Sequence, residues 1–255
     1  MKHRIITITF YSLLILLALL SLFASISAWY FVAVIAVYMV VVAYGSSIIS
    51  SGYHLKAICS GSTKEKVVAI TFDDGPHPVT MTILDVLKQH NAKAAFFCIG
   101  KNIEEYPEIM RRIVAEGHTI GNHSYSHTRT FDFYRKNRVV DELKKTDALL
   151  EQFSGKRNIY FRPPYGVTNP SIRRAVAETK HKVIGWNIRS LDTLIKDRET
   201  LLMRIKSMIT PGGIVLLHDT SEHTAEALEE LLKFLADNKY RVVPLEELLQ
   251  PEYEK

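Results

Sequence analysis

The chain has 255 residues, a formal net charge of +5 at pH 7 and two cysteines, Cys59 and Cys98. Lysine and arginine are scattered among acidic residues instead of forming a basic stripe, which argues against nucleic acid as a partner. Cys98 lies in an apolar run typical of a buried free thiol, and the cysteine content does not indicate a cellular compartment.

The first part of the chain differs from the rest: residues 5–49 are almost wholly apolar and carry no charged side chain. As one helix they would extend ~68 Å, more than twice the ~30 Å hydrocarbon core of a bilayer. Two helices, at about 5–24 and 29–49, fit that thickness. Trp29 and Tyr30 would then lie at the membrane interface, where amphipathic rings prefer to be.

A cleaved signal peptide is the alternative, because Lys2 and Arg4 precede the first apolar run. Cleavage there would leave the second run as an exposed apolar tail, so we favour a transmembrane hairpin within residues 1–50. Residues 51–66 are a mixed linker, and residues 67–255 have the pattern of one α/β domain with a substantial core.

Strands and helices alternate through this domain. The predicted strands are 67–72, 94–99, 118–121, 159–161, 182–186, 213–217 and 240–243, and the predicted helices are 80–90, 103–116, 141–153, 171–179, 199–209, 224–238 and 245–249. This alternation predicts a largely parallel sheet, and the number of units favours a (β/α) barrel, complete or incomplete.

Two adjacent carboxylates, Asp73 and Asp74, follow the first strand in the sequence TFDDGP. Ligand sites collect at such strand ends in α/β folds. Side chains alternate along an extended segment, so the two carboxylates should point in different directions. That arrangement suits a proton-transfer base beside a metal ligand, although a solvated turn is the simpler interpretation of this segment alone.

A histidine pair, His123 and His127, follows the strand 118–121 in the sequence HSYSH. Two imidazoles four residues apart share a face if the segment is helical, within reach of one divalent ion. Alone, such a pair is usually explained by ordinary surface histidines. With Asp74 it would complete a ligand set of two histidines and one carboxylate, with positions left for water and substrate.

The sequence RPPYG, residues 162–166, follows another strand. Arg162 has the fork geometry that holds a carboxylate. The double proline stiffens the loop and leaves Tyr165 with an N–H that could face a developing oxyanion. A rigid turn with an outward arginine is the alternative.

His218 ends an apolar strand in the sequence LLHD, and Asp192 follows the end of another strand. Each is weak evidence alone, since a histidine at a strand end is more often structural. Together with the preceding segments they supply metal ligands, a base, an acid and an oxyanion donor, all just beyond predicted strands. A metal-assisted hydrolase requires this set of groups.

TFDDGP, HSYSH, RPPYG and LLHD occur in this order, and the chain thereby resembles the NodB-homology polysaccharide deacetylases, carbohydrate esterase family 4. The resemblance covers about residues 67–249. It implies a distorted, incomplete (β/α) barrel and removal of N-acetyl groups from amino sugars. It also implies one divalent metal ion, usually zinc, although cobalt or nickel can serve.

The same resemblance implies roles for individual residues. Asp73 matches the general base of the family, and the family's metal ligands correspond to Asp74, His123 and His127.

By the same resemblance, His218 matches the general acid and Asp192 the carboxylate that supports it. Arg162 matches the residue that orients the base, and the amide of Tyr165 the oxyanion donor. The chain departs from the family at Thr193, where a tryptophan near the substrate is common, so the acceptor pocket is expected to differ.

Three functions follow from this sequence. The first is an N-deacetylase of a polysaccharide or cell-envelope glycan, and the second is a deacetylase or deformylase of a lipid-linked sugar at the membrane. The third is an inactive glycan-binding module, which the retention of Asp73, His218 and all three expected metal ligands disfavours.

The expected location is the cytoplasmic (inner) membrane of a bacterium. The basic residues that flank the two ends of the hairpin are Lys2, Arg4, Lys56, Lys64 and Lys66. By the positive-inside rule, they put both ends and the catalytic domain in the cytoplasm. Polysaccharides normally lie outside the cell. Either the second apolar run does not span, or the substrate is a lipid-linked intermediate on the cytoplasmic face.

Overall fold

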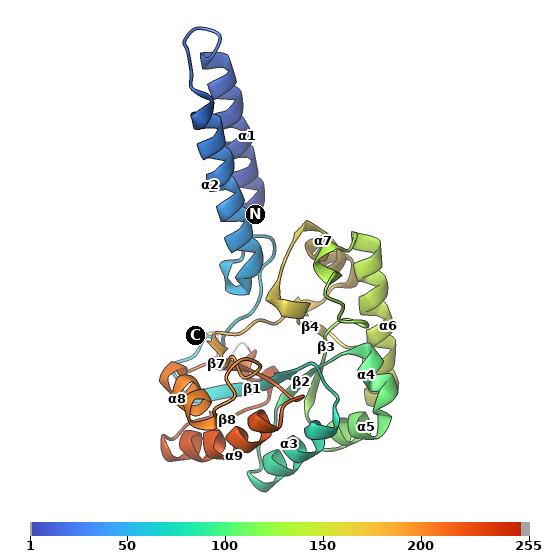
Figure 1. Cartoon of the computed structure of the whole chain (residues 1–255). Helices are drawn as coiled ribbons and strands as arrows, with labels where there is room; N and C mark the ends of the chain where they lie inside the picture. Colours follow the sequence, from blue (N-terminus) through green and yellow to red (C-terminus); the bar gives the residue numbers. More distant parts are fainter. Residues whose placement is uncertain (1, 251–255) are drawn as a thin grey trace.

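The computed structural model describes residues 2–250; residue 1 and residues 251–255, at the two ends of the predicted domains, lie outside the described part. Two long helices, α1 (Lys2–Leu20) and α2 (Ala28–Ser47), form a hairpin that projects from an α/β domain (Figure 1). Both are long and apolar enough to cross a membrane, and Gly45 is the one residue in them that is buried.

The α/β domain contains one parallel sheet. Its strands are β1 (Val67–Asp73), β2 (Ala95–Cys98), β3 (Thr119–Asn122), β4 (Tyr160–Phe161), β5 (Lys182–Val183), β6 (Ile188–Arg189), β7 (Gly213–His218) and β8 (Arg241–Val242). The order is β5-β4-β3-β2-β1-β7-β6, with β8 beside β1. The path ends at β5 and β6, which do not pair with each other within residues 2–250. The predicted incomplete (β/α) barrel is therefore confirmed.

Helices cover the outer face of this curled sheet (Figure 1). They are α3 (Pro78–Gln89), α4 (Gly100–Glu105), α5 (Pro107–Ala115), α6 (Lys136–Ser154), α7 (Pro170–Thr179), α8 (Arg198–Met208) and α9 (Glu222–Asp237). The short helix α10 (Leu245–Leu248) packs instead against inner-face side chains, in one cluster with Val67 and Ala69 of β1. Short 3₁₀ turns lie at Ile49–Ser51, Phe131–Phe133 and Pro164–Gly166.

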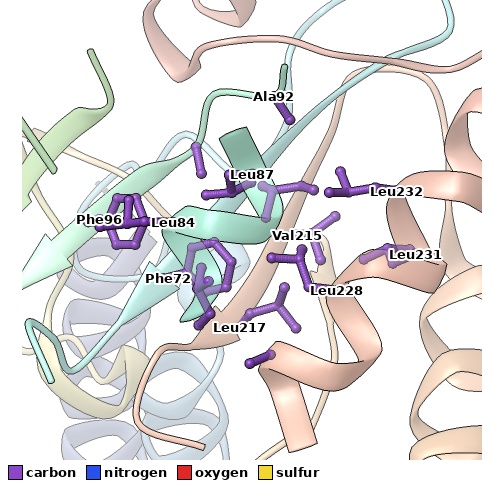
Figure 2. Packing of buried hydrophobic residues seen from close by; sticks show 14 of the residues in the cluster. Phe72, Leu84, Leu87, Ala92, Phe96, Val215, Leu217, Leu228, Leu231 and Leu232 are labelled. Carbon is purple, nitrogen blue, oxygen red and sulfur yellow. The ribbon is translucent and has the colours of Figure 1, made fainter. Parts of the chain in front are cut away.

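The main core lies between the sheet and helices α3 and α9. Phe72 of β1 stacks on Phe96 of β2, with ring centroids 5.2 Å apart. Figure 2 shows these rings and Leu217 of β7 in one cluster with Leu84 of α3 and Leu228 of α9. Because side chains alternate along a strand, burying Phe72 outward directs its neighbours Thr71 and Asp73 toward the inner face.

Two predicted elements differ in the structure. The predicted helix 103–116 is α4 and α5, separated at Tyr106, which precedes Pro107 and has a non-helical φ of −125°. A residue before proline is driven out of the helical region by a steric clash with the proline ring. The predicted strand 182–186 ends at Val183, and the chain continues into β6, which the sequence did not predict.

The end of α2 is packed into the α/β domain. Ile49, just after the helix, is 5% exposed and belongs to the cluster that contains Phe131 and Phe161. The N–H of Thr168 donates to the carbonyl oxygen of Ser46 over 2.9 Å. The hairpin is therefore fixed to the domain by side-chain packing and a backbone hydrogen bond.

The following segment, predicted as a linker at 51–66, also contacts the sheet. Ile58 forms a parallel bridge with Ile184, and Ser60 forms an antiparallel bridge with Gly213. Residues 58–60 thus extend along the open side of the barrel before the chain enters β1.

Replacing Ile49 by alanine tests this docking. Because Ile49 lies in a packed core, Ile49→Ala should destabilise the α/β domain of the full chain in detergent by about 2–5 kcal/mol. Ile48→Ala is the matched control, since Ile48 is 38% exposed and should cost under about 1 kcal/mol. Chemical denaturation followed by circular dichroism measures both, and equal small effects would mean that the hairpin is only tethered.

Candidate active site

A buried ion pair lies at the tip of β1. Arg162 has no exposed surface, and its Nη1 donates to Oδ1 of Asp73 over 2.7 Å and to the hydroxyl of Thr71 over 2.8 Å. Its Nε and Nη2 donate to the carbonyl oxygens of Ile184 and Gly185. Burial lowers the pKa of Arg162, and the Asp73 carboxylate opposes that shift. These contacts fix one oxygen of Asp73 and leave the other toward the cavity.

Beside this pair, Asp74, His123 and His127 form a compact set of donor atoms. Oδ1 of Asp74 lies 3.4 Å from Nε2 of His123 and 3.3 Å from Nε2 of His127, and one donor atom from each residue lies within 4.8 Å of the others. Asp73 is close to the set, with Oδ2 3.8 Å from Nε2 of His123. The sequence prediction thus named the residues that the fold brings together here.

The electrostatics of this set fit a cation. Oδ1 of Asp74 is buried and has no hydrogen-bond partner among residues 2–250. Nδ1 of His123 lies 2.8 Å from the carbonyl oxygen of Arg162, so Nδ1 must be the donor and Nε2 faces Asp74. Burial alone lowers the pKa of His123, but Asp73 and Asp74 raise it overall. Two nitrogens and one carboxylate oxygen therefore surround a place that favours positive charge.

The backbone that positions these donors differs from the prediction. The 123–127 segment is not helical, because Ser124 and His127 have left-handed backbone angles, φ 68° and 44°. The two imidazoles nevertheless face each other, with centroids 4.9 Å apart. Asp74 is also left-handed, with φ 77°, so it leaves the strand path and does not simply alternate with Asp73.

Glu142 of α6 holds this loop in its bent shape. One carboxylate oxygen accepts from the N–H groups of Tyr125 and Ser126 over 3.0 and 2.7 Å, and the other accepts from the Ser126 hydroxyl over 2.8 Å. A carboxylate that accepts three hydrogen bonds between the two histidines thus ties the loop to α6. Nothing in the sequence around Glu142 indicated this role, because the contact joins a helix to a distant loop.

A second hydrogen-bonded pair lies on the other side of the cavity. Nδ1 of His218 is 2.8 Å from Oδ1 of Asp192, and the His218 N–H donates to Oδ2 over 2.7 Å. Asp192 is fully buried and also accepts from the hydroxyls of Ser190 and Thr224. Burial lowers the pKa of His218, but Asp192, with smaller contributions from Asp73 and Asp74, outweighs it and raises the pKa to about 9. His218 is therefore protonated at neutral pH, with Nε2 free of this pair.

One cavity of about 340 Å³ joins these groups. Six of the eight predicted site residues line it, and Arg162 and Asp192 lie buried behind Asp73 and His218. Tyr165, with a left-handed φ of 58°, forms part of the wall, and its hydroxyl donates to the carbonyl oxygen of His127 over 3.3 Å. Thr193 also lines the cavity, where its small side chain leaves room.

Comparison with known proteins identifies the family of this chain. The model of the family described as "Polysaccharide deacetylase" matches residues 60–184. The structure of the peptidoglycan N-acetylglucosamine deacetylase Bc1960 is 32% identical, with a TM-score of 0.72 over 78% of this chain and 95% of that chain. The chain belongs to the polysaccharide deacetylase family.

Two further members of the polysaccharide deacetylase family show its range. The peptidoglycan-N-acetylmuramic acid deacetylase PdaC of Bacillus subtilis is 35% identical over 72% of this chain, which spans only 39% of that protein's length. BA3943 of Bacillus anthracis, described as a pseudoenzyme, is 29% identical, with a TM-score of 0.71 over 76% of this chain and 69% of that chain.

Removing the Glu142 carboxylate tests its effect on the histidine loop. Glu142→Ala should weaken zinc binding by about 10- to 100-fold, as is usual when a group that orients a ligand is lost. Competition with a chromogenic chelator measures the affinity without any need for turnover. Glu151→Ala removes an exposed carboxylate from the same helix and should leave the affinity unchanged. Unchanged affinity in Glu142→Ala would show that the loop holds its shape without this contact.

Proposed function

We propose that this polysaccharide deacetylase family member is a metal-dependent hydrolase that removes N-acetyl groups from amino sugars of a cell-envelope glycan. The supporting observation is that two carboxylate-centred pairs, Asp73–Arg162 and Asp192–His218, face one His₂-Asp donor set across a single cavity. Relatives named as peptidoglycan deacetylases make an N-acetylated sugar of peptidoglycan the first substrate to test.

The proposed metal ligands are Asp74, His123 and His127, with zinc as the expected ion and cobalt or nickel as alternatives. When bound there, the ion would polarise the acyl oxygen and lower the pKa of a water molecule toward ~7. We assign Asp73 as the base that removes the proton of the attacking water, since its free oxygen faces the donor set and Arg162 fixes its other oxygen.

His218 would then act as the general acid. Its Nδ1 is engaged by Asp192, so Nε2 is the atom that can deliver a proton to the leaving nitrogen. Asp192 keeps the ring protonated and oriented. The amide N–H of Tyr165, in the loop that borders the donor set, is the proposed additional donor to the developing oxyanion.

An inactive glycan-binding protein is the competing function, because the family includes a relative described as a pseudoenzyme. In this chain the base, the acid and the three donor residues are all present, and they lie within reach of one another. That completeness favours catalysis.

We further propose that α1 and α2 anchor the protein in a bacterial cytoplasmic membrane. This is supported by the exposed apolar side chains of both helices, and by helix lengths that match the thickness of a bilayer. Ile49, directly after α2, lies against Gly185, whose carbonyl oxygen accepts from Arg162. The docked hairpin thus favours a substrate close to the bilayer, including a lipid-linked amino sugar. Protease accessibility of the α/β domain in intact spheroplasts would show which side of the membrane the domain faces.

Chelation and two asparagine variants test the division of roles. Removing the metal should abolish acetate release, and added zinc or cobalt should restore it. Asp73→Asn should keep about one metal ion per chain while losing most turnover, whereas Asp74→Asn should lose both. Metal content by mass spectrometry and acetate release measure these effects. Equal loss of metal in the two variants would show that the roles are wrongly divided.

The pH dependence of turnover tests the acid pair. Activity should fall as pH rises through about 9, where His218 loses its proton. Asp192→Asn removes the charge that raises this pKa, so the alkaline limb should move to lower pH while metal content stays constant. His218→Ala should lower the rate about 10²- to 10⁴-fold. If the alkaline limb of the pH–rate profile does not shift in Asp192→Asn, a group other than this pair determines the pKa of that limb.

A further inference from the structure

Arg189 is a cavity residue that the proposed chemistry does not use. It ends β6, the edge strand of the open barrel, and is paired in parallel register with Leu216 of β7, which is itself in register with Thr71 of β1. Residues in register on parallel strands point to the same face of the sheet. Thr71 contacts Arg162 on the inner face, so Arg189 also points inward, and it lines the cavity with His218.

Arg189 is exposed, and among residues 2–250 its side chain forms no hydrogen bond or ion pair. The carboxylates that line the cavity are Asp73 and Asp74, which face Arg162 and the two histidines. A second arginine adds positive charge at this edge, because Nε of Arg204 donates to the carbonyl oxygen of Arg189 over 3.1 Å. Among residues 2–250, Arg189 is thus a cation without a partner in the cavity that contains the proposed catalytic groups.

We propose that Arg189 binds an anionic group, a carboxylate or a phosphate, carried by the amino-sugar substrate, and so determines specificity. This inference rests on the proposed deacetylase function and deepens it. A planar guanidinium donates two parallel hydrogen bonds to either anion, and these charge-assisted bonds are stronger than those it can donate to the hydroxyl oxygens of a neutral sugar. The carboxylate source would be the lactyl group of N-acetylmuramic acid, and the phosphate source a sugar joined to a phosphate.

Neighbouring residues give this edge the space for such a group. Leu191 has a left-handed φ of 63°, which turns the chain away after β6, and Thr193 contributes only a small side chain to the wall. Leu194 is 73% exposed at the same rim. At this edge Arg189 therefore lines the cavity among small and apolar groups, an arrangement suited to a sugar with a charged substituent.

Three soluble substrates of equal length test the proposal in the full chain with zinc. They are N-acetylglucosamine tetrasaccharide, the same tetrasaccharide 1-phosphate, and an alternating N-acetylglucosamine–N-acetylmuramic acid tetrasaccharide. Arg189→Gln should lower the ratio of kcat/KM for the favoured anionic substrate to that for the neutral one by about 10- to 100-fold, mainly through KM. Arg189→Lys should recover part of the ratio, and the favoured anion identifies the carboxylate or the phosphate source.

Arg174→Gln is the matched control, because it removes an exposed arginine of α7 that does not line the cavity. It should leave the ratio unchanged. Titration calorimetry on Asp73→Asn, with and without Arg189→Gln, measures binding of the same sugars independently of turnover. An equal effect of Arg189→Gln on charged and neutral sugars in both assays would overturn the proposal. Selective binding of the anionic sugars, without acetate release by the unmutated protein, would support the role of Arg189 and contradict only the proposed deacetylase function.

Discussion

The buried contact between Arg162 and Asp73 organises the active-site side of this fold. A guanidinium with no exposed surface must have a counter-charge and acceptors for its donors, and Asp73, Thr71 and two carbonyl oxygens supply them. Loss of one partner from a buried pair costs about 3–5 kcal/mol, because the other charge is left uncompensated. The need to satisfy Arg162 therefore fixes the ends of β1 and β4 and the chain after β5 relative to one another.

Around this contact, the site is made from strand ends and loops whose backbone turns sharply. Asp74, Ser124, His127 and Tyr165 all have left-handed φ values, an uncommon state for residues other than glycine. Such angles persist only where surrounding contacts impose them. Here Glu142 fixes the histidine loop, and Asn102 donates to the carbonyl oxygen of Asp74 over 2.7 Å. The rigid sheet and these contacts together aim the donor atoms at one place.

The residues with proposed chemical roles could be identified from the sequence because they lie in short segments directly after predicted strands, as with Asp73, His123 and His218. The residues that position them could not. Glu142 sits on an ordinary amphipathic helix, and its contact with residues 125–126 depends on how α6 packs. The short strand β6, with only two residues, has no period that a pattern could reveal. The same holds for Arg189, whose inward direction follows from register alone.

The packing of Ile49 into the domain also limits how freely the parts of this protein can be exchanged in evolution. An N-terminal helix pair joined by a free linker can be replaced by any other apolar pair. Here a replacement would have to keep an apolar residue against Phe131 and Phe161 and a carbonyl oxygen opposite Thr168. Exchange of the helix pair alone would therefore leave this apolar cluster incomplete, so the end of α2 and the domain form one packed unit.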